Sequence, residues 1–116
     1  MKVAVYSLLF LFVPSATFAS GAIAVDANWS KKGPPVYAIV IGYDSVEEAS
    51  RAAFRKCMTN GGSRCGVVAN FDKCGAFAYS ATSSGTGWGL TGRIARNMAL
   101  RNCGDNHIAV ASECEP

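Results

Sequence analysis

The fold is decided by a six-residue stretch that occurs twice, first as Gly21-Ala-Ile-Ala-Val-Asp26 and again as Gly75-Ala-Phe-Ala-Tyr-Ser80. Both copies are short and apolar, and each begins with Gly and ends with a polar residue, which is the pattern of a buried strand. A repeat of this kind indicates two copies of one supersecondary unit. We therefore predict a single domain over residues 20–116, made of related units over about residues 21–74 and 75–114.

A helix with the same landmarks follows in each copy. Residues 45–57 correspond to residues 91–103, with alanines at matching positions and a cysteine at the end of both. Ser45 and Glu48 have the spacing of a capping box, and Thr91 offers the same hydroxyl in the second copy. Residues three or four apart form one face of each helix, namely Val46, Ala49, Ala53 and Cys57, and Ile94 or Ala95, Met98, Ala99 and Cys103. We expect these faces to lie close to a sheet, because alanine side chains are short.

Further apolar segments complete each unit as strand, strand, helix and strand. Residues 37–43 provide a second strand, and residues 65–71 and 107–111 provide the last strands. A polar loop over residues 28–35 and a Ser/Gly-rich counterpart over 81–87 follow the first strands. We predict an α+β domain with an antiparallel or mixed sheet of about six strands and two helices packed on one face.

Residues 1–19 have the organisation of a cleavable secretory signal peptide. Lys2 provides a positive start, residues 3–13 are apolar, and small residues precede a cut predicted after Ala19. Such an apolar run spans about 16 Å as a helix, roughly half of a bilayer core, so cleavage is favoured over a permanent anchor. We therefore expect a periplasmic or secreted protein that has no membrane association after cleavage.

The five cysteines all follow the predicted cut, and disulfides are a common source of stability in small exported domains. With one cysteine left over, about fifteen pairings are possible. The repeat favours Cys57–Cys65, across a Gly-Gly turn from helix end to strand start, and Cys74–Cys114, at strand ends that we take as equivalent. Cys103 is then a free thiol, which we expect to be a small buried hydrophobe, with an intermolecular bridge as an alternative.

Residues that catalysis or metal binding would need are sparse. His107 is the only histidine, and with Cys103 it supplies two of the four ligands that zinc prefers. Hydrolase motifs are absent, and Gly85-Thr-Gly-Trp-Gly89 lies in an expected hairpin connection, where a turn or bulge is favoured over a phosphate-binding loop. We predict no enzyme activity, no metal and no cofactor. The alternative is a secreted cell-envelope hydrolase with a carboxylate pair drawn from Asp44, Asp72, Asp105 and Glu113.

Aromatic residues near loops and strand ends are the remaining candidates for function. Trp29, Trp88, Tyr43 and Tyr79 are of types enriched at binding hot spots, although packing between sheet and loops is their alternative role. The net charge of +3 and the scattered basic residues give no reason to expect nucleic acid as a partner. We predict a monomer or weak dimer that binds another protein or an envelope macromolecule, as an inhibitor, immunity factor or secreted effector.

Several landmarks carry a family resemblance. They are the Gly-Ala-Ile-Ala strand, the Ser-x-x-Glu-Ala helix ending at Cys57, the Gly-Gly turn before Cys65, the Cys-Gly-Ala segment at Cys74, and Gly87-Trp-Gly89 before the second helix. Together they resemble a secreted bacterial family catalogued as domain of unknown function 4189, over nearly all of residues 21–114. The resemblance implies export and a fold, and it brings no set of catalytic residues. The turn after Cys103 departs from the pattern, because it is shorter than the turn after Cys57 and lacks a partner cysteine.

Overall fold

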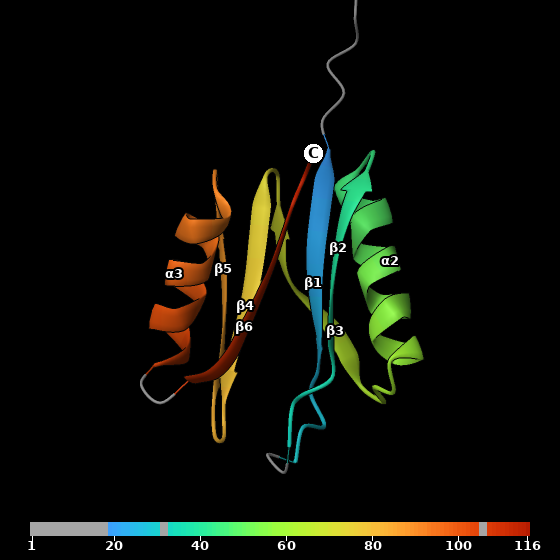
Figure 1. Cartoon of the computed structure of the whole chain (residues 1–116). Helices are drawn as coiled ribbons and strands as arrows, with labels where there is room; N and C mark the ends of the chain where they lie inside the picture. Colours follow the sequence, from blue (N-terminus) through green and yellow to red (C-terminus); the bar gives the residue numbers. More distant parts are fainter. Residues whose placement is uncertain (1–18, 31–32, 105–106) are drawn as a thin grey trace, which may run out of the picture.

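The computed structural model describes residues 19–30, 33–104 and 107–116, with only the backbone of residues 107 and 108. Residues 1–18 of the predicted signal peptide and Asp105 of the proposed carboxylates lie outside this range. The described residues form two helices and six strands in the order strand, strand, helix, strand, twice over (Figure 1). This order confirms the α+β class and agrees with the internal repeat. The elements are β1 (Ser20–Asp26), β2 (Tyr37–Tyr43), α2 (Val46–Thr59), β3 (Cys65–Phe71), β4 (Cys74–Ser80), β5 (Ser84–Gly89), α3 (Gly92–Cys103) and β6 (His107–Cys114).

The strands are divided between two three-stranded antiparallel sheets, ordered β2-β1-β3 and β5-β4-β6. Each sheet carries one helix on its outer face, and the inner faces of the sheets pack against each other (Figure 1). The arrangement therefore differs from the expected single sheet with both helices on one face. The reason is visible in β1, where Ala22 and Ala24 face α2 while Ile23 faces the other sheet. A strand buried on both faces is apolar throughout, so its sequence does not reveal how many sheets there are.

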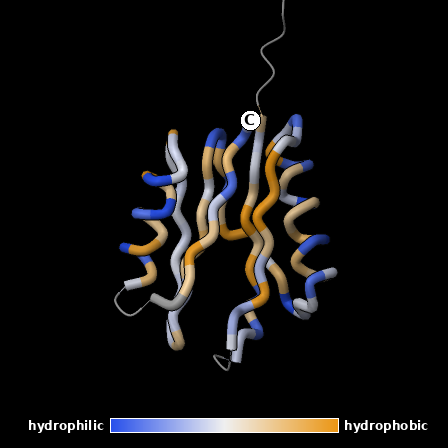
Figure 2. Tube along the Cα trace, in the orientation of Figure 1, coloured by the Kyte–Doolittle hydropathy of each residue, from blue (hydrophilic) through white to orange (hydrophobic). Residues whose placement is uncertain are grey.

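The core between the sheets contains the largest buried side chains. Ile23, Ile39, Phe71 and Phe77 form it, and Phe77 is 1% exposed. The ring of Tyr37 lies 4.6 Å from the ring of Phe77. Figure 2 shows the apolar residues concentrated in the strands and the hydrophilic residues of both helices mainly on their outer sides. Contact between the two units is thus made by large apolar side chains.

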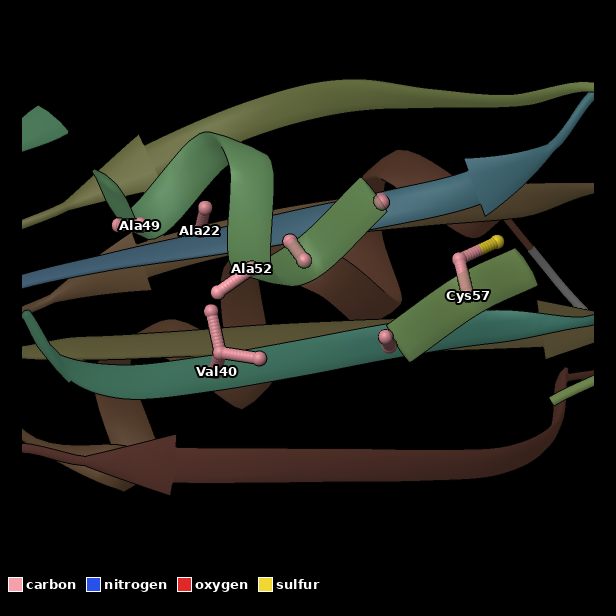
Figure 3. Close-up of a cluster of buried hydrophobic side chains, with 8 residues drawn as sticks. Ala22, Val40, Ala49, Ala52 and Cys57 are labelled. Atoms are coloured by element: carbon pink, nitrogen blue, oxygen red, sulfur yellow. The ribbon is translucent and has the colours of Figure 1, made fainter. Parts of the chain in front are cut away.

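The contacts between helices and sheets use small side chains instead. Helix α2 packs through alanines and Cys57 on alanines and Val40 of the first sheet (Figure 3). Helix α3 does the same in the second unit, with Ala95, Ala99 and Cys103 buried. The expected close approach is therefore confirmed at these positions, whereas Val46 and Ile94 at the outer ends of the expected faces are about half exposed.

Strand β5 brings its backbone against α3 by means of glycine. A Cβ atom at Gly87 would overlap the backbone of Ala95 and Ala99, and one at Gly85 would overlap the backbone of Ala99 and Cys103. The glycine-rich segment is therefore a strand surface on which the helix lies, and the expected turn or bulge is wrong. The connection before it is short, because β4 ends at Ser80 and β5 begins at Ser84.

Both helices have the predicted hydroxyl caps. The N–H of Glu48 donates to Ser45 Oγ at 3.1 Å, and the N–H of Ile94 donates to Thr91 Oγ1 at 3.1 Å. The reciprocal half of the capping box takes a different form, because the Glu48 carboxylate accepts from the Ser45 hydroxyl at 3.2 Å instead of from its backbone. These caps satisfy backbone donors of the first helical turns.

The structure contains disulfides at both predicted pairs, Cys57–Cys65 and Cys74–Cys114, and leaves Cys103 free and buried. The second bridge has a different setting from the one expected. Cys74 is the first residue of β4 and lies directly opposite Cys114 on β6, so the bridge joins neighbouring strands of the second unit. The units therefore meet at the two-residue turn between β3 and β4, formed by Asp72 and Lys73.

Candidate functional site

The four aromatic residues proposed for binding do not form one site. Trp29 lies in the β1–β2 connection, where its indole N–H donates to the carbonyl oxygen of Gly33 at 3.0 Å. Tyr43 packs beside the buried cluster under α2, and Tyr79 packs beside the core between the sheets. Trp88 is the next-to-last residue of β5, which ends at the opposite end of the sandwich from the β1–β2 connection (Figure 1). Of the four, Trp88 presents the most open apolar surface, since 47% of it is exposed.

Two further exposed apolar residues lie at the same end of β5 as Trp88: Leu90, which lines a cavity with it, and Ile94, which lies against Gly89. We call Trp88, Leu90 and Ile94 the β5-end patch. Leu90 is 77% exposed and Ile94 is 49% exposed. Gly87 and Gly89 occupy the side of β5 that faces α3, so Trp88 points to the other face, whereas Ile94 lies against Gly89 on the α3 side. Because β5 is an edge strand, the patch extends around the end of the sheet.

A shallow cavity of about 180 Å³ adjoins the β5-end patch. Phe71 and the charged pair Asp72 and Lys73 line it together with Trp88 and Leu90. The chain near its C-terminus fixes this wall. The backbone N–H of Glu115 donates to the carbonyl oxygen of Lys73 at 2.7 Å, and the Glu115 carboxylate accepts from the N–H of Gly42 at 2.9 Å. These two hydrogen bonds of Glu115 therefore fix the backbone at Lys73, which lines the cavity beside the patch.

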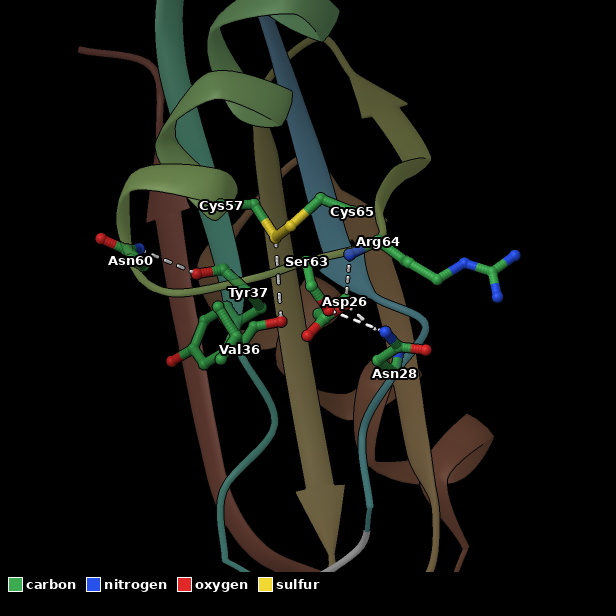
Figure 4. The surroundings of a disulfide bond; sticks show 9 residues. All are labelled: Asp26, Asn28, Val36, Tyr37, Cys57, Asn60, Ser63, Arg64 and Cys65. Atoms are coloured by element: carbon green, nitrogen blue, oxygen red, sulfur yellow. Dashed lines mark hydrogen bonds between the residues drawn. A yellow bond between two sulfur atoms is a disulfide. The ribbon is translucent and has the colours of Figure 1, made fainter.

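Among the carboxylates proposed for the alternative hydrolase, none of those that the structure describes is buried. Asp44, Asp72 and Glu113 are exposed. The buried Asp26 is a different case, because its carboxylate accepts the backbone N–H groups of Arg64 at 2.9 Å and Asn28 at 3.1 Å (Figure 4). These hydrogen bonds hold the pKa of Asp26 below its ordinary value, whereas a general acid needs a raised pKa. Asp26 thus serves to fix two loops beside the Cys57–Cys65 bridge.

The described residues provide no candidate site for metal binding or thiol chemistry. Within them, no group of three or more His, Cys, Asp or Glu residues is placed to hold a metal ion. Cys103 is 5% exposed, and its sulfur lies 3.8 Å from the carbonyl oxygen of Ser83. The Ser83 hydroxyl also donates to the carbonyl oxygen of Cys103 at 2.7 Å. Cys103 therefore has the buried position that the sequence indicated.

These features define a small sandwich of two related α+β units. Each unit has its own disulfide, and an apolar patch lies at the end of the edge strand β5. The chain belongs to the family described as domain of unknown function (DUF4189), whose family model matches residues 20–115. The match covers every helix and strand of the structure. Neither a curated protein nor a solved structure gives a match to the chain. In the part of the chain that the structure describes, neither helix is long and apolar enough to cross a membrane.

Sequence reasoning found Trp88 and missed its neighbours. Helical periodicity offered Ile94 as an alternative to Ala95 for the buried face, and the structure buries Ala95. Leu90 carried no periodic signal, because it lies between a strand and a helix. An available signal was the alternation of Gly85, Gly87 and Gly89, which places every larger residue of β5 on the other face.

Proposed function

We propose that this protein is a non-enzymatic binding protein that engages another macromolecule through the β5-end patch, in the periplasm or outside the cell. The observation that carries the proposal is the exposure of Trp88, Leu90 and Ile94 together, next to a shallow cavity. Contiguous exposed apolar residues that include tryptophan are typical of interaction sites. An inhibitor, an immunity factor and a secreted effector all belong to this class of protein.

The surroundings of the patch support a protein or an envelope macromolecule as the partner. Asp72 and Lys73 place charges of both signs beside Trp88 and Leu90. An apolar centre with a polar rim is the usual anatomy of a protein interface. The export that this role requires is supported by the signal-peptide pattern of residues 1–19 and by the two disulfides, which persist in oxidising compartments.

The proposal is tested by affinity capture from periplasmic extract with the wild type and the double variant Trp88→Ala/Leu90→Ala. We expect the double variant to lose the captured partner, because interface tryptophans dominate binding energy. Val46→Ala is the matched control, since Val46 is an apolar residue with 49% exposure at the start of the other helix. Circular dichroism confirms that each variant is folded. Capture of the same partner by the double variant would remove the patch as the binding site.

A second variant tests whether the β1–β2 connection contributes to binding in addition to the β5-end patch. Trp29→Ala removes an indole that is bonded within its own connection, to Gly33. We expect this change to alter partner affinity less than twofold, measured by surface plasmon resonance with the captured partner. A loss as large as that of Trp88→Ala would instead place the binding surface at both ends of the sandwich.

A further inference from the structure

A second surface feature lies along the other edge of the sandwich, where the edge strands β2 and β6 lie next to each other. A groove of about 350 Å³ follows β2 there. Three consecutive residues of β2, Tyr37–Ile39, line it together with Lys56 of α2, Asn60 at the end of that helix, and Glu113 of β6. The groove therefore has the edge of a strand along it, a helix on one side and a strand of the other sheet on the opposite side.

The backbone of β2 offers hydrogen-bonding groups to this groove. In the register with β1, the N–H of Asp26 donates to the carbonyl oxygen of Val36, and Ala24 lies opposite Ala38. Residues at even positions of β2 therefore pair with β1, and the N–H and C=O groups of Tyr37 and Ile39 point outward. The Asn60 side chain donates to the carbonyl oxygen of Tyr37 at 3.1 Å. Within the described part of the chain, the N–H of Tyr37 and both groups of Ile39 have no hydrogen-bond partner, so they can bond to a ligand.

The two walls of the groove carry opposite charges. Lys56 lies in the last turn of α2, which covers the outer face of the sheet, and Asn60 caps that turn. On β6, Ala111 packs into the core between the sheets, so Glu113, two residues later, points to the same side. Among the residues that the structure describes, neither Lys56 nor Glu113 forms an ion pair or a side-chain hydrogen bond. Both charges are thus free to meet a ligand.

We propose that this groove binds an extended peptide segment of a partner protein, which adds to the edge of β2 as a further strand. Main-chain hydrogen bonds to Tyr37 and Ile39 hold such a segment, and side-chain contacts select it. Successive side chains of a strand point to opposite faces. The selected segment therefore has an acidic residue facing Lys56 and, at an odd spacing such as the next position, a basic residue facing Glu113.

Two synthetic peptides of the same composition test this spacing. The first is acetyl-Thr-Val-Glu-Lys-Val-Thr-amide, with the two charges on opposite faces. The second is acetyl-Thr-Glu-Val-Lys-Val-Thr-amide, with both charges on one face. We expect the first to bind the purified protein at least tenfold more tightly in an NMR titration, with the largest amide shifts at Tyr37 and Ile39. Equal affinities, shifts elsewhere, or no binding of either peptide at millimolar concentration would overturn the proposal.

Charge reversal provides the second part of the test. Lys56→Glu and Glu113→Lys should each weaken binding of the first peptide about tenfold, while Arg55→Glu, an exposed neighbour on α2 outside this groove, should leave it unchanged. The double variant Lys56→Glu/Glu113→Lys should regain the affinity, because a shift of one residue turns every side chain of the peptide to the other face. Failure of this rescue, with both single variants weakened, would mean that the charges do not select the peptide. The variant Trp88→Ala/Leu90→Ala should bind the peptide normally, so this site and the β5-end patch are tested separately.

Discussion

Asp26 and Ser80 occupy the same place in the two units, at the end of the first strand, and both are buried. Asp26 accepts backbone N–H groups from Asn28 and Arg64, whereas the Ser80 hydroxyl accepts them from Thr82 and Ser83. Different side chains thus accept hydrogen bonds from the backbone N–H groups near the end of each strand. Burial of a polar residue here serves the turn, since buried polar groups need hydrogen-bond partners.

The acid sensitivity of the protein should depend on Asp26. Its pKa in the folded state lies below the ordinary value of 3.8, so the unfolded chain takes up the proton first as the pH falls. The stability that ionised Asp26 contributes is complete above pH 3.8 and is lost as the pH falls below it through the folded-state pKa. We expect Asp26→Asn to lower stability at neutral pH and to flatten the decline below about pH 4. Urea unfolding between pH 2.5 and 7 measures this, and an unchanged acid decline in the variant would assign it to other groups.

Cys103 should react slowly in the native protein. Its side chain is 5% exposed at the end of α3, so a reagent cannot readily reach the sulfur in the folded state. We expect one slow thiol per native chain that reacts rapidly once the protein is unfolded. Cys103→Ser should cost about 1–2 kcal/mol, because it places a hydroxyl where a hydrophobe packs. Thiol titration with and without denaturant is the measurement, and fast stoichiometric labelling of native protein would contradict burial.

At the scale of elements, the contact between β5 and α3 should tolerate no added carbon. A Cβ at Gly87 would meet the helix backbone, which has no freedom to rotate away. We expect Gly87→Ala to destabilise the protein by about 2–3 kcal/mol. Gly66 is the matched control, because it lies on edge strand β3, where an added Cβ would have nothing within 4 Å. Gly66→Ala should change stability by less than about 0.5 kcal/mol in the same urea titration. Similar losses in both variants would contradict the assignment of the Gly87 effect to contact with the helix.

The elements differed in how well their sequences revealed them. Helices α2 and α3 and strands β1 and β4 were predictable, because alanines and hydroxyl caps recur at matched positions. Strand β5 was not, since its alternating glycines provide no hydrophobic signal and favour turns in isolation. The division into two sheets was hidden because both faces of β1 are apolar. The candidate site was half predictable, since Trp88 is conspicuous by residue type whereas the exposure of Leu90 and Ile94 depends on the position of α3.

At the scale of the whole molecule, the two disulfides should contribute unequally. Cys74–Cys114 closes a separation of 40 residues and Cys57–Cys65 closes 8. On the chain-entropy model their loss costs about 4 and about 2.5 kcal/mol respectively. Paired Cys→Ala variants of each bridge, compared by urea unfolding, should show this order. Peptide mapping of the unreduced protein is the control for the pairing, and a peptide linked through Cys103 would contradict it.

The turn formed by Asp72 and Lys73 has a consequence for the history of the chain. Each disulfide stays within one unit, so this exposed turn is the covalent connection between the halves. A protease nick there would leave two fragments joined without a covalent bond, by contacts that include the apolar core around Ile23 and Phe77 and the hydrogen bond from Gly42 to Glu115. Denaturation would separate them without any reductant. Ile23 and Phe77 occupy equivalent positions of the repeat, so the two units meet through corresponding parts of their first strands. The present chain is what gene duplication and fusion of a symmetric homodimer would produce.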